Sequence, residues 1–197
     1  TRCLSDWSSD VCSSDLMIRA CLLTLLLSGC ASISHCPPLP GGLDYCLQSS
    51  LEVPAFAATQ DVRVRYGNLD ERLIAQLEVD GDGMRLVGMT PMGQRLISAQ
   101  YDNRAATADK VPGDRFEATA LLSLIQLATW PEASVRSGLG DRWRLEETPS
   151  RRRILRDGQP VLVIDRLGSP PHYRHLTIHL PDAGLSLSID GIETGSP

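Results

Sequence analysis

Three histidines near the end of the chain carry side chains that often bind metal ions. His175 and His179 are four residues apart, a spacing that would place both on one face of a helix. The surrounding residues alternate between apolar and polar, which predicts a strand, where these two side chains lie about 13 Å apart. One metal ion cannot reach both at that distance. We expect no metal site and interpret the pair as part of a solvated strand face. The alternative is metal binding at the surface, to which His172 would add a third imidazole.

The sequence lacks the motifs that place a nucleophile, a phosphate group or a catalytic zinc ion. It contains no Gly-x-Ser-x-Gly, no phosphate-binding loop and no His-Glu-x-x-His. We therefore expect no catalytic residues, no cofactor and no enzyme activity, and a hydrolase is the least favoured alternative.

Two cysteines are placed to form a disulfide. Cys36 and Cys46 bracket the stretch CPPLPGGLDYC. In an oxidising compartment they can close this loop, which would stabilise the fold by about 2 to 3 kcal/mol. A zinc site is the weaker interpretation, because structural zinc takes four ligands and no second pair of Cys or His has a matching spacing.

Cys30 follows a short apolar run that begins after Arg19. A membrane-spanning helix needs about 20 apolar residues, whereas the apolar run at 20–27 is shorter and predicts the core of a signal peptide. Gly29 and the proline-rich segment beyond Cys30 disfavour the alternative of a buried core helix.

The sequence Leu27-Ser28-Gly29-Cys30 resembles the lipobox of bacterial lipoproteins. The resemblance implies that the chain is cut between Gly29 and Cys30, and that the Cys30 thiol and the new amino terminus are acylated. Two or more acyl chains hold a protein stably on a bilayer. Ala31 stands where an aspartate would signal retention at the inner membrane, so the resemblance implies the outer membrane, on its periplasmic side.

The chain divides into four predicted segments. Residues 1–16 contain DWSSDVCSSDL, which resembles the translation of a sequencing adapter, so we expect a non-native leader, with a natural disordered leader as the alternative. We then expect a signal peptide at 17–29, a lipidated tether rich in Pro, Ser and Gly at 30–60, and one domain at 61–195. With 19 basic and 24 acidic residues, the chain has no basic excess for binding nucleic acid.

Alternating apolar and polar residues predict an antiparallel sheet in two groups of strands. The predicted strands lie at 72–80, 84–89, 94–102, 141–147, 151–158, 159–167, 172–180 and 184–192. Asp157-Gly158 is a strong signal for a tight hairpin.

One convincing helix lies between the two groups of strands. Asp114 can cap it, with Glu117 completing a capping box. Its polar residues form one narrow stripe that ends at Ser123 and Gln126, and apolar residues cover the remaining surface, so the helix must be enclosed. A second short helix is predicted to follow Pro131.

Five segments carry a family resemblance: LVGMTPMGQRL at 86–96, YD at 101–102, LATWP at 127–131, WRL at 143–145 and RILRDG at 153–158. They resemble a family of bacterial outer-membrane lipoproteins of unknown function that is often found beside aryl-polyene synthesis genes. Members are similar in outline to LolB and LolA, lipoprotein carriers in which helices close an incomplete β-barrel around an apolar cavity. The resemblance covers residues 60–195. It implies a mainly β fold of the α+β class, with a strongly curved antiparallel sheet or incomplete barrel closed by one or two helices.

The inner face of such a sheet would surround either a lipid cavity or a solid core. Burying an acyl chain of about fifteen methylenes could contribute on the order of 12 kcal/mol before ordering costs, yet the same side chains would equally form a packed core. The candidate lining residues are Leu77, Val79, Leu86, Leu121, Ile125, Ile178 and Leu187.

The remaining prominent side chains are basic or aromatic. Arg151, Arg152, Arg153 and Arg156 would either meet anionic headgroups or an acidic partner, or keep a hairpin edge from pairing with neighbouring strands. Trp130 and Trp143 are expected in the core, with lining of the cavity mouth as the alternative.

Two functions fit these expectations. In the first, the chain faces the periplasm from the outer membrane and binds or transfers a lipid or an acylated protein, with an aryl-polyene lipid as one cargo and a periplasmic carrier as a partner. In the second, it is a non-enzymatic structural accessory of an outer-membrane assembly, with a solid core and no ligand.

Overall fold

A computed structural model describes residues 36–109 and 118–192 of the chain. The predicted leader, the signal peptide, Cys30, and the helix-capping residues Asp114 and Glu117 lie outside the described residues. Within those residues no helix is long and apolar enough to cross a membrane.

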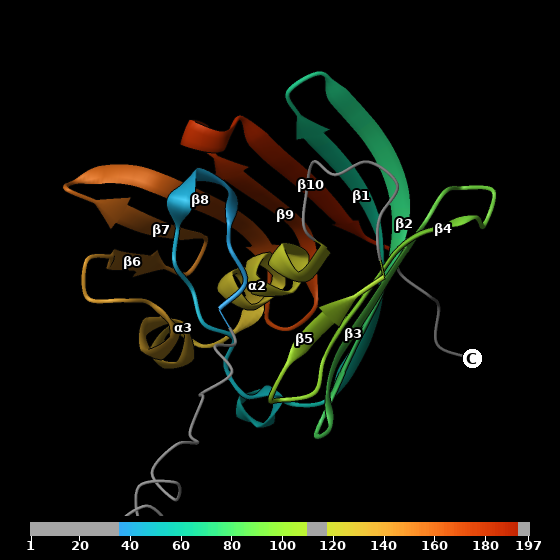
Figure 1. Cartoon of the computed structure of the whole chain (residues 1–197), viewed down its shortest axis with the longest axis horizontal. Helices are drawn as coiled ribbons and strands as arrows, with labels where there is room; N and C mark the ends of the chain where they lie inside the picture. The colour runs from blue at the N-terminus through green and yellow to red at the C-terminus, as the bar shows by residue number, and fades with distance from the viewer. Residues whose placement is uncertain (1–35, 110–117, 193–197) are drawn as a thin grey trace, which may run out of the picture. The chain divides into compact units, whose positions relative to one another are not determined.

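Two antiparallel meanders of five strands each join edge to edge into one ten-stranded sheet (Figure 1). The first meander consists of β1 (Phe56–Tyr66), β2 (Leu69–Asp80), β3 (Gly83–Met89), β4 (Arg95–Tyr101) and β5 (Ala106–Ala108). The second consists of β6 (Arg144–Thr148), β7 (Arg151–Arg156), β8 (Gln159–Gly168), β9 (Tyr173–Leu180) and β10 (Leu185–Gly191).

The first and last strands of the sequence lie side by side at the centre of the sheet. The strand order is β5-β4-β3-β2-β1-β10-β9-β8-β7-β6, and β5 and β6 are its edges among the described residues. The sheet curves but does not close on itself (Figure 1). The predicted mainly β, antiparallel and incompletely closed fold is therefore confirmed.

Helix α2 (Ala118–Thr129) lies inside the curve of the sheet, and α3 (Glu132–Gly138) follows it near β6 (Figure 1). The predicted second helix is confirmed, since Pro131 caps α3 and the helix ends at Gly138. Three 3-10 turns complete the secondary structure: η1 (Pro40–Gly42), η2 (Ser50–Glu52) and η3 (Pro181–Ala183).

The strand register places alternate apolar side chains on the inner face. Val62 is paired with Leu73 on β2 and with Ile189 on β10, and Ile178 is paired with Leu187. All five are buried, whereas the residues between them on the same strands are more exposed. This alternation gives the sheet one apolar face, which packs around α2.

Residues 36–60, expected to belong to a tether, are instead part of the domain. Leu43, Tyr45 and Leu47 are buried in the core, and β1 begins at Phe56. A disulfide joins Cys36 to Cys46, and the Cys46 amide donates to the Gly138 carbonyl at the end of α3. The segment has irregular turns rather than a period of two or 3.6 residues, so its apolar residues gave no periodic signal.

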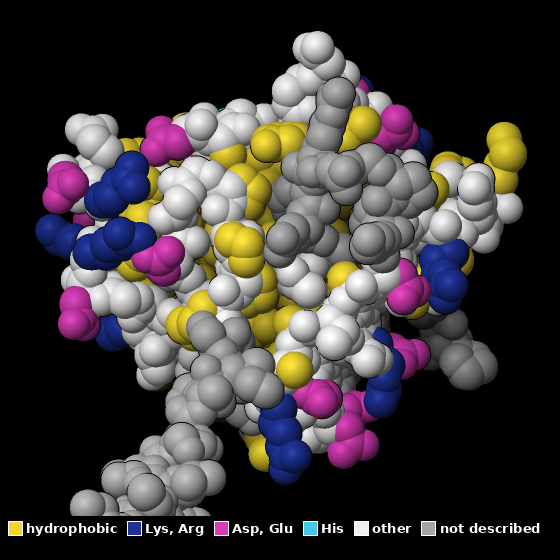
Figure 2. Space-filling model, in the orientation of Figure 1, with side chains coloured by type: hydrophobic (Ala, Val, Ile, Leu, Met, Phe, Trp, Pro, Cys, Tyr) yellow, Lys and Arg dark blue, Asp and Glu magenta, His cyan; other side chains and the backbone are white. Residues whose placement is uncertain are grey.

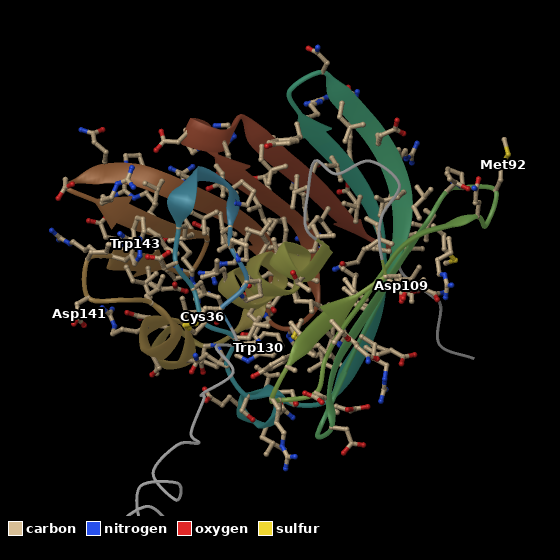
Figure 3. The ribbon with its side chains drawn as sticks, in the orientation of Figure 1. Cys36, Met92, Asp109, Trp130, Asp141 and Trp143 are labelled. Atoms are coloured by element: carbon tan, nitrogen blue, oxygen red, sulfur yellow. A yellow bond between two sulfur atoms is a disulfide. The ribbon has the colours of Figure 1, made fainter. Side chains whose placement is uncertain are left out.

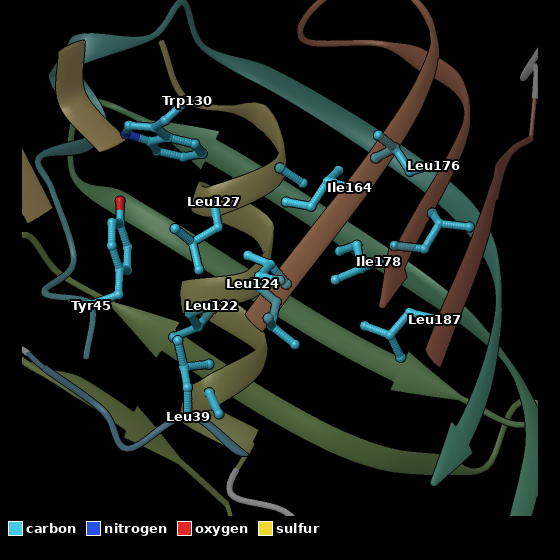
Figure 4. Packing of buried hydrophobic residues seen from close by; sticks show 14 of the residues in the cluster. Leu39, Tyr45, Leu122, Leu124, Leu127, Trp130, Ile164, Leu176, Ile178 and Leu187 are labelled. Atoms are coloured by element: carbon cyan, nitrogen blue, oxygen red, sulfur yellow. The ribbon is translucent and has the colours of Figure 1, made fainter. Parts of the chain in front are cut away.

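Gln126, the last residue of the polar stripe of α2, faces this N-terminal segment. Gln126 is fully buried, and its Oε1 accepts hydrogen bonds from the Tyr45 hydroxyl at 3.1 Å and the Gln48 amide at 2.7 Å. Its Nε2 donates to the Gln48 carbonyl at 2.8 Å. Figure 4 shows Tyr45 on one side of α2 and Ile178 on the other. The polar and apolar sides of α2 therefore bind two different parts of the fold.

Candidate functional site

A small apolar cavity of about 50 Å³ lies between α2 and the inner face of the sheet. The side chains around it come from strands of both meanders and from one side of α2. They belong to Gln60, Val62, Val64, Leu73, Ala75, Leu86, Gly88, Ile97, Leu121, Leu124, Ile125, Ile178, Leu187 and Ile189. None of these residues carries a charge, so the cavity suits an uncharged, apolar ligand.

Two small residues in one cross-strand row leave the free space. Gln60, Ala75 and Gly88 are direct cross-strand neighbours on β1, β2 and β3. Ala75 and Gly88 leave room that larger side chains would fill. The room is narrow, because a Cβ atom added at Gly88 would lie 3.4 Å from the Ile97 Cβ atom and 3.4 Å from the Leu73 Cδ1 atom.

Five of the seven predicted lining residues surround this cavity: Leu86, Leu121, Ile125, Ile178 and Leu187. Leu77 and Val79 do not line it, although both are buried on the inner face as expected. They lie farther along β2, where Leu77 pairs with Leu86, and Val79 pairs with Phe56 and Met84. The larger side chains at those positions fill the interior.

The contribution of β1 to the cavity lining was not predicted from the sequence. Val62 and Val64 alternate with Arg63 and Arg65, and this pattern could have identified the strand. Gln60 was assigned to the tether because β1 begins before the first clear alternation.

Buried charged residues hold the opposite end of α2. The Arg152 side chain is 1% exposed, and its Nη1 and Nη2 donate to the carbonyls of Leu127 and Trp130 at 2.5 and 2.9 Å. A cation at this position satisfies carbonyl groups that have no partner within the helix, and it also opposes the negative end of the helix dipole. Arg152 therefore fixes the C-terminal end of α2 to β7.

Glu147 bridges Arg152 to a second buried arginine. Its carboxylate accepts from Arg152 Nε at 2.5 Å and from Arg166 Nη2 at 2.5 Å. Burial raises the pKa of Glu147, but the hydrogen bonds from Arg152 and Arg166 outweigh burial and leave the pKa below its ordinary value. Glu147 is therefore ionised at neutral pH, as the two cations require.

The predicted arginine cluster is divided between the two faces of the sheet. Arg151 and Arg153 lie on the outer face, where they pair with Asp165 and Glu146 at 2.5 Å each. Arg152 points inward, so the interpretation of the whole run as a surface cluster is wrong. The reason is the alternation of side chains along β7.

Trp130 and Trp143 are both buried. Trp130 Nε1 donates to the Ser49 carbonyl at 3.1 Å, which joins the end of α2 to the N-terminal segment. Trp143 lies beside β6 and β7 (Figure 3), with the guanidinium groups of Arg142 and Arg156 at 4.9 and 5.6 Å from its ring.

The three histidines near the end of the chain, His172, His175 and His179, lie on or beside β9, and the predicted strand there is confirmed. His175 Nδ1 is 2.6 Å from Asp190 Oδ1 on β10. His172 and His179 are exposed. Across residues 36–109 and 118–192, no group of three or more His, Cys, Asp or Glu residues is arranged to hold a metal ion.

A family model described as a protein of unknown function, DUF3261, matches residues 57–193. The chain belongs to the DUF3261 family. The DUF3261 match includes all the residues that line the cavity, and Glu147, Arg152 and Arg166 as well. The predicted membership in a family of unknown function is confirmed, and its association with aryl-polyene genes stays a prediction.

No curated protein matches this DUF3261 chain. Among solved structures, one match is a domain from Vibrio parahaemolyticus, provisionally described as an outer membrane lipoprotein-sorting protein. The two share 8% sequence identity with a TM-score of 0.32, and the match covers 72% of this chain and 86% of that chain.

Replacing Arg152 by methionine should destabilise the fold strongly. Arg152→Met leaves the Leu127 and Trp130 carbonyls without a donor and removes one of the two cations paired with Glu147. We expect the free energy of unfolding in urea to fall by about 3 to 5 kcal/mol. The control Arg153→Met removes an exposed partner of Glu146 from the same strand and should cost less than about 1 kcal/mol. Equal losses in the two variants would contradict the role given to Arg152.

Acid should weaken the fold through Glu147. Because its pKa is lower in the folded chain than in the unfolded chain, its contribution is fully present above the unfolded value, about 4.3, and disappears as pH falls through the folded value. Urea unfolding from pH 7 to pH 3 should show this loss below about pH 4.3. Glu147→Gln should show a smaller loss over the same window, and identical pH profiles would refute the assignment.

Proposed function

We propose that the domain binds an acyl chain of a lipid or of an acylated protein between α2 and the inner face of the sheet. The observation that carries this proposal is the uncharged cavity beside α2. Figure 2 shows hydrophobic side chains near the centre of the molecular surface in this view, with charged side chains mainly toward the edges. An apolar site with a charged surround favours the hydrocarbon part of an amphipathic ligand.

The cavity must enlarge before it can hold a chain. Sites for small molecules usually measure about 300 to 1,000 Å³, several times the present volume. Polar contacts hold α2 at Gln126, Leu127 and Trp130, whereas Leu121 and Ile125 meet the cavity only through apolar, partly buried side chains. An acyl chain can replace such apolar contacts without leaving a polar group unpaired. Transfer then proceeds by partitioning between apolar sites, with no covalent step.

A second function is favoured by the small size of the cavity. If α2 stays in place, the interior is close to a solid core, as expected for a structural accessory of an outer-membrane assembly. Measuring whether the domain takes up a ligand distinguishes acyl-chain binding from the role of a structural accessory.

The proposal places the domain at the periplasmic side of the outer membrane, attached through lipid on Cys30. The lipobox-like sequence supports the attachment, and the disulfide between Cys36 and Cys46 suits an oxidising compartment. The proposed cargo is acylated, with an aryl-polyene lipid as one member of this class, and the proposed partner is a periplasmic carrier.

Filling the cavity should block uptake. The full chain with Cys30→Ser, which cannot carry its own lipid, should retain added phospholipid in native mass spectrometry and bind a fluorescent fatty-acyl ester. Adding Ala75→Val introduces two methyl groups into the cross-strand row that contains Ala75 and Gly88 and should weaken binding by about tenfold, with an unchanged or higher melting temperature.

The control Ala57→Val adds the same groups to an exposed position on β1 and should bind as the parent does. A folded Ala75→Val variant with undiminished uptake would argue against this cavity as the site. A parent chain that retains no lipid and binds no ester would favour the structural accessory.

The anchor can be tested separately in a Gram-negative host. The wild-type chain should enter the detergent phase on Triton X-114 partitioning, because its acyl chains prefer detergent micelles. Cys30→Ser should stay in the aqueous phase. A wild-type chain found in the aqueous phase would rule out lipidation at this position.

A further inference from the structure

Gln60 carries the one polar side chain among the described residues that line the cavity. It is half-buried on β1, with Ala75 as its cross-strand neighbour. Within the part of the chain that the structure describes, no hydrogen bond reaches its side-chain amide. An amide that faces an apolar cavity offers one acceptor and two donor hydrogens to a ligand.

Charged groups close to Gln60 in sequence lie on the outer face of the sheet. Asp61 forms an ion pair with Arg72, and Arg63 pairs with Asp70 at 2.7 Å. The Glu147–Arg152–Arg166 group lies on the second meander, and none of its members lines the cavity. Among the described residues, a ligand group beside Gln60 therefore meets a neutral hydrogen-bonding partner and no counter-ion.

We infer that the cavity selects a neutral acyl group, an ester or an amide, over an ionised fatty acid, and that Gln60 binds its carbonyl. This inference rests on the proposed acyl-chain site. An ionised carboxylate placed there would lose water and gain no opposite charge, which is costly in apolar surroundings. An ester or amide carbonyl carries no charge and accepts a single hydrogen bond from Gln60 Nε2.

The two neutral groups differ in the hydrogen bonds that they can offer Gln60. A secondary amide can either accept from Nε2 or donate to Oε1, because its trans C=O and N–H groups point in opposite directions and reach only one end of the side-chain amide. An ester can only accept. A hydrocarbon satisfies neither end, and it should bind through the apolar lining alone.

The test compares four ligands with the same sixteen-carbon chain: hexadecane, methyl palmitate, N-methylpalmitamide and palmitate at pH 8. Each displaces a fluorescent neutral ester from the full chain carrying Cys30→Ser. We expect the ester and the amide to bind at least about tenfold more tightly than palmitate. They should also bind about threefold to tenfold more tightly than hexadecane, the difference made by one hydrogen bond.

Gln60→Leu should remove the advantage of the ester and amide over hexadecane while leaving hexadecane binding intact. Gln76→Leu makes the same change at an exposed position on β2 and should preserve the wild-type order. Melting temperatures of both variants check that they fold.

The outcomes separate this inference from the proposed function. Palmitate binding as tightly as the ester, or an ester-to-hexadecane ratio unchanged by Gln60→Leu, would overturn the inference and leave the acyl site standing. Failure of all four ligands to displace the probe, together with no binding of the probe itself, would overturn the acyl site and the inference with it.

Discussion

The C-terminal end of α2 is buried, and the carbonyl groups there have no partner within the helix. Arg152 supplies the missing donors, since one guanidinium reaches both the Leu127 and Trp130 carbonyls. Placing a cation inside the fold requires a counter-ion, and Glu147 provides it while also pairing with Arg166. The position of α2 relative to the second meander therefore depends on this group of three charges.

Different contacts hold the remaining parts of α2, and this difference matters for function. Gln126 ties the helix to the N-terminal segment through Tyr45 and Gln48. Leu121 and Ile125 face the cavity, where the contacts are apolar and nondirectional. Fixed polar contacts on one side and replaceable apolar contacts on the other are what a site for a hydrocarbon chain requires.

Much of the sheet could be predicted from sequence, because most of its strands alternate clearly and are joined by turns rich in Gly and Asp. The placement of Leu86, Ile178 and Leu187 beside the cavity follows from that alternation. Alternation within one strand predicts which face of the sheet a side chain lies on, but not which part of the packed helix it contacts. For this reason Leu77 and Val79 were correctly predicted to lie on the inner face but were wrongly predicted to line the cavity.

Other features were hidden because they depend on pairing between distant residues. Arg152 looked like part of a basic surface run, and only its contacts with Glu147 and α2 explain its burial. Residues 36–55 follow irregular turns, and the polar partners of Gln126, Tyr45 and Gln48, come from that segment. Neither a helical nor a strand period encodes such contacts.

The pairing of β1 with β10 has a consequence for how the chain reaches its native state. β1 obtains its second hydrogen-bonded neighbour from β10, the last of the ten described strands along the chain. The first meander keeps an open edge at β1 until β10 can pair with it, and pairing between strands so far apart in the sequence slows folding. An unpaired edge next to apolar side chains is prone to self-association, so a chaperone that shields β1 before β10 pairs with it would protect the chain when it is most vulnerable.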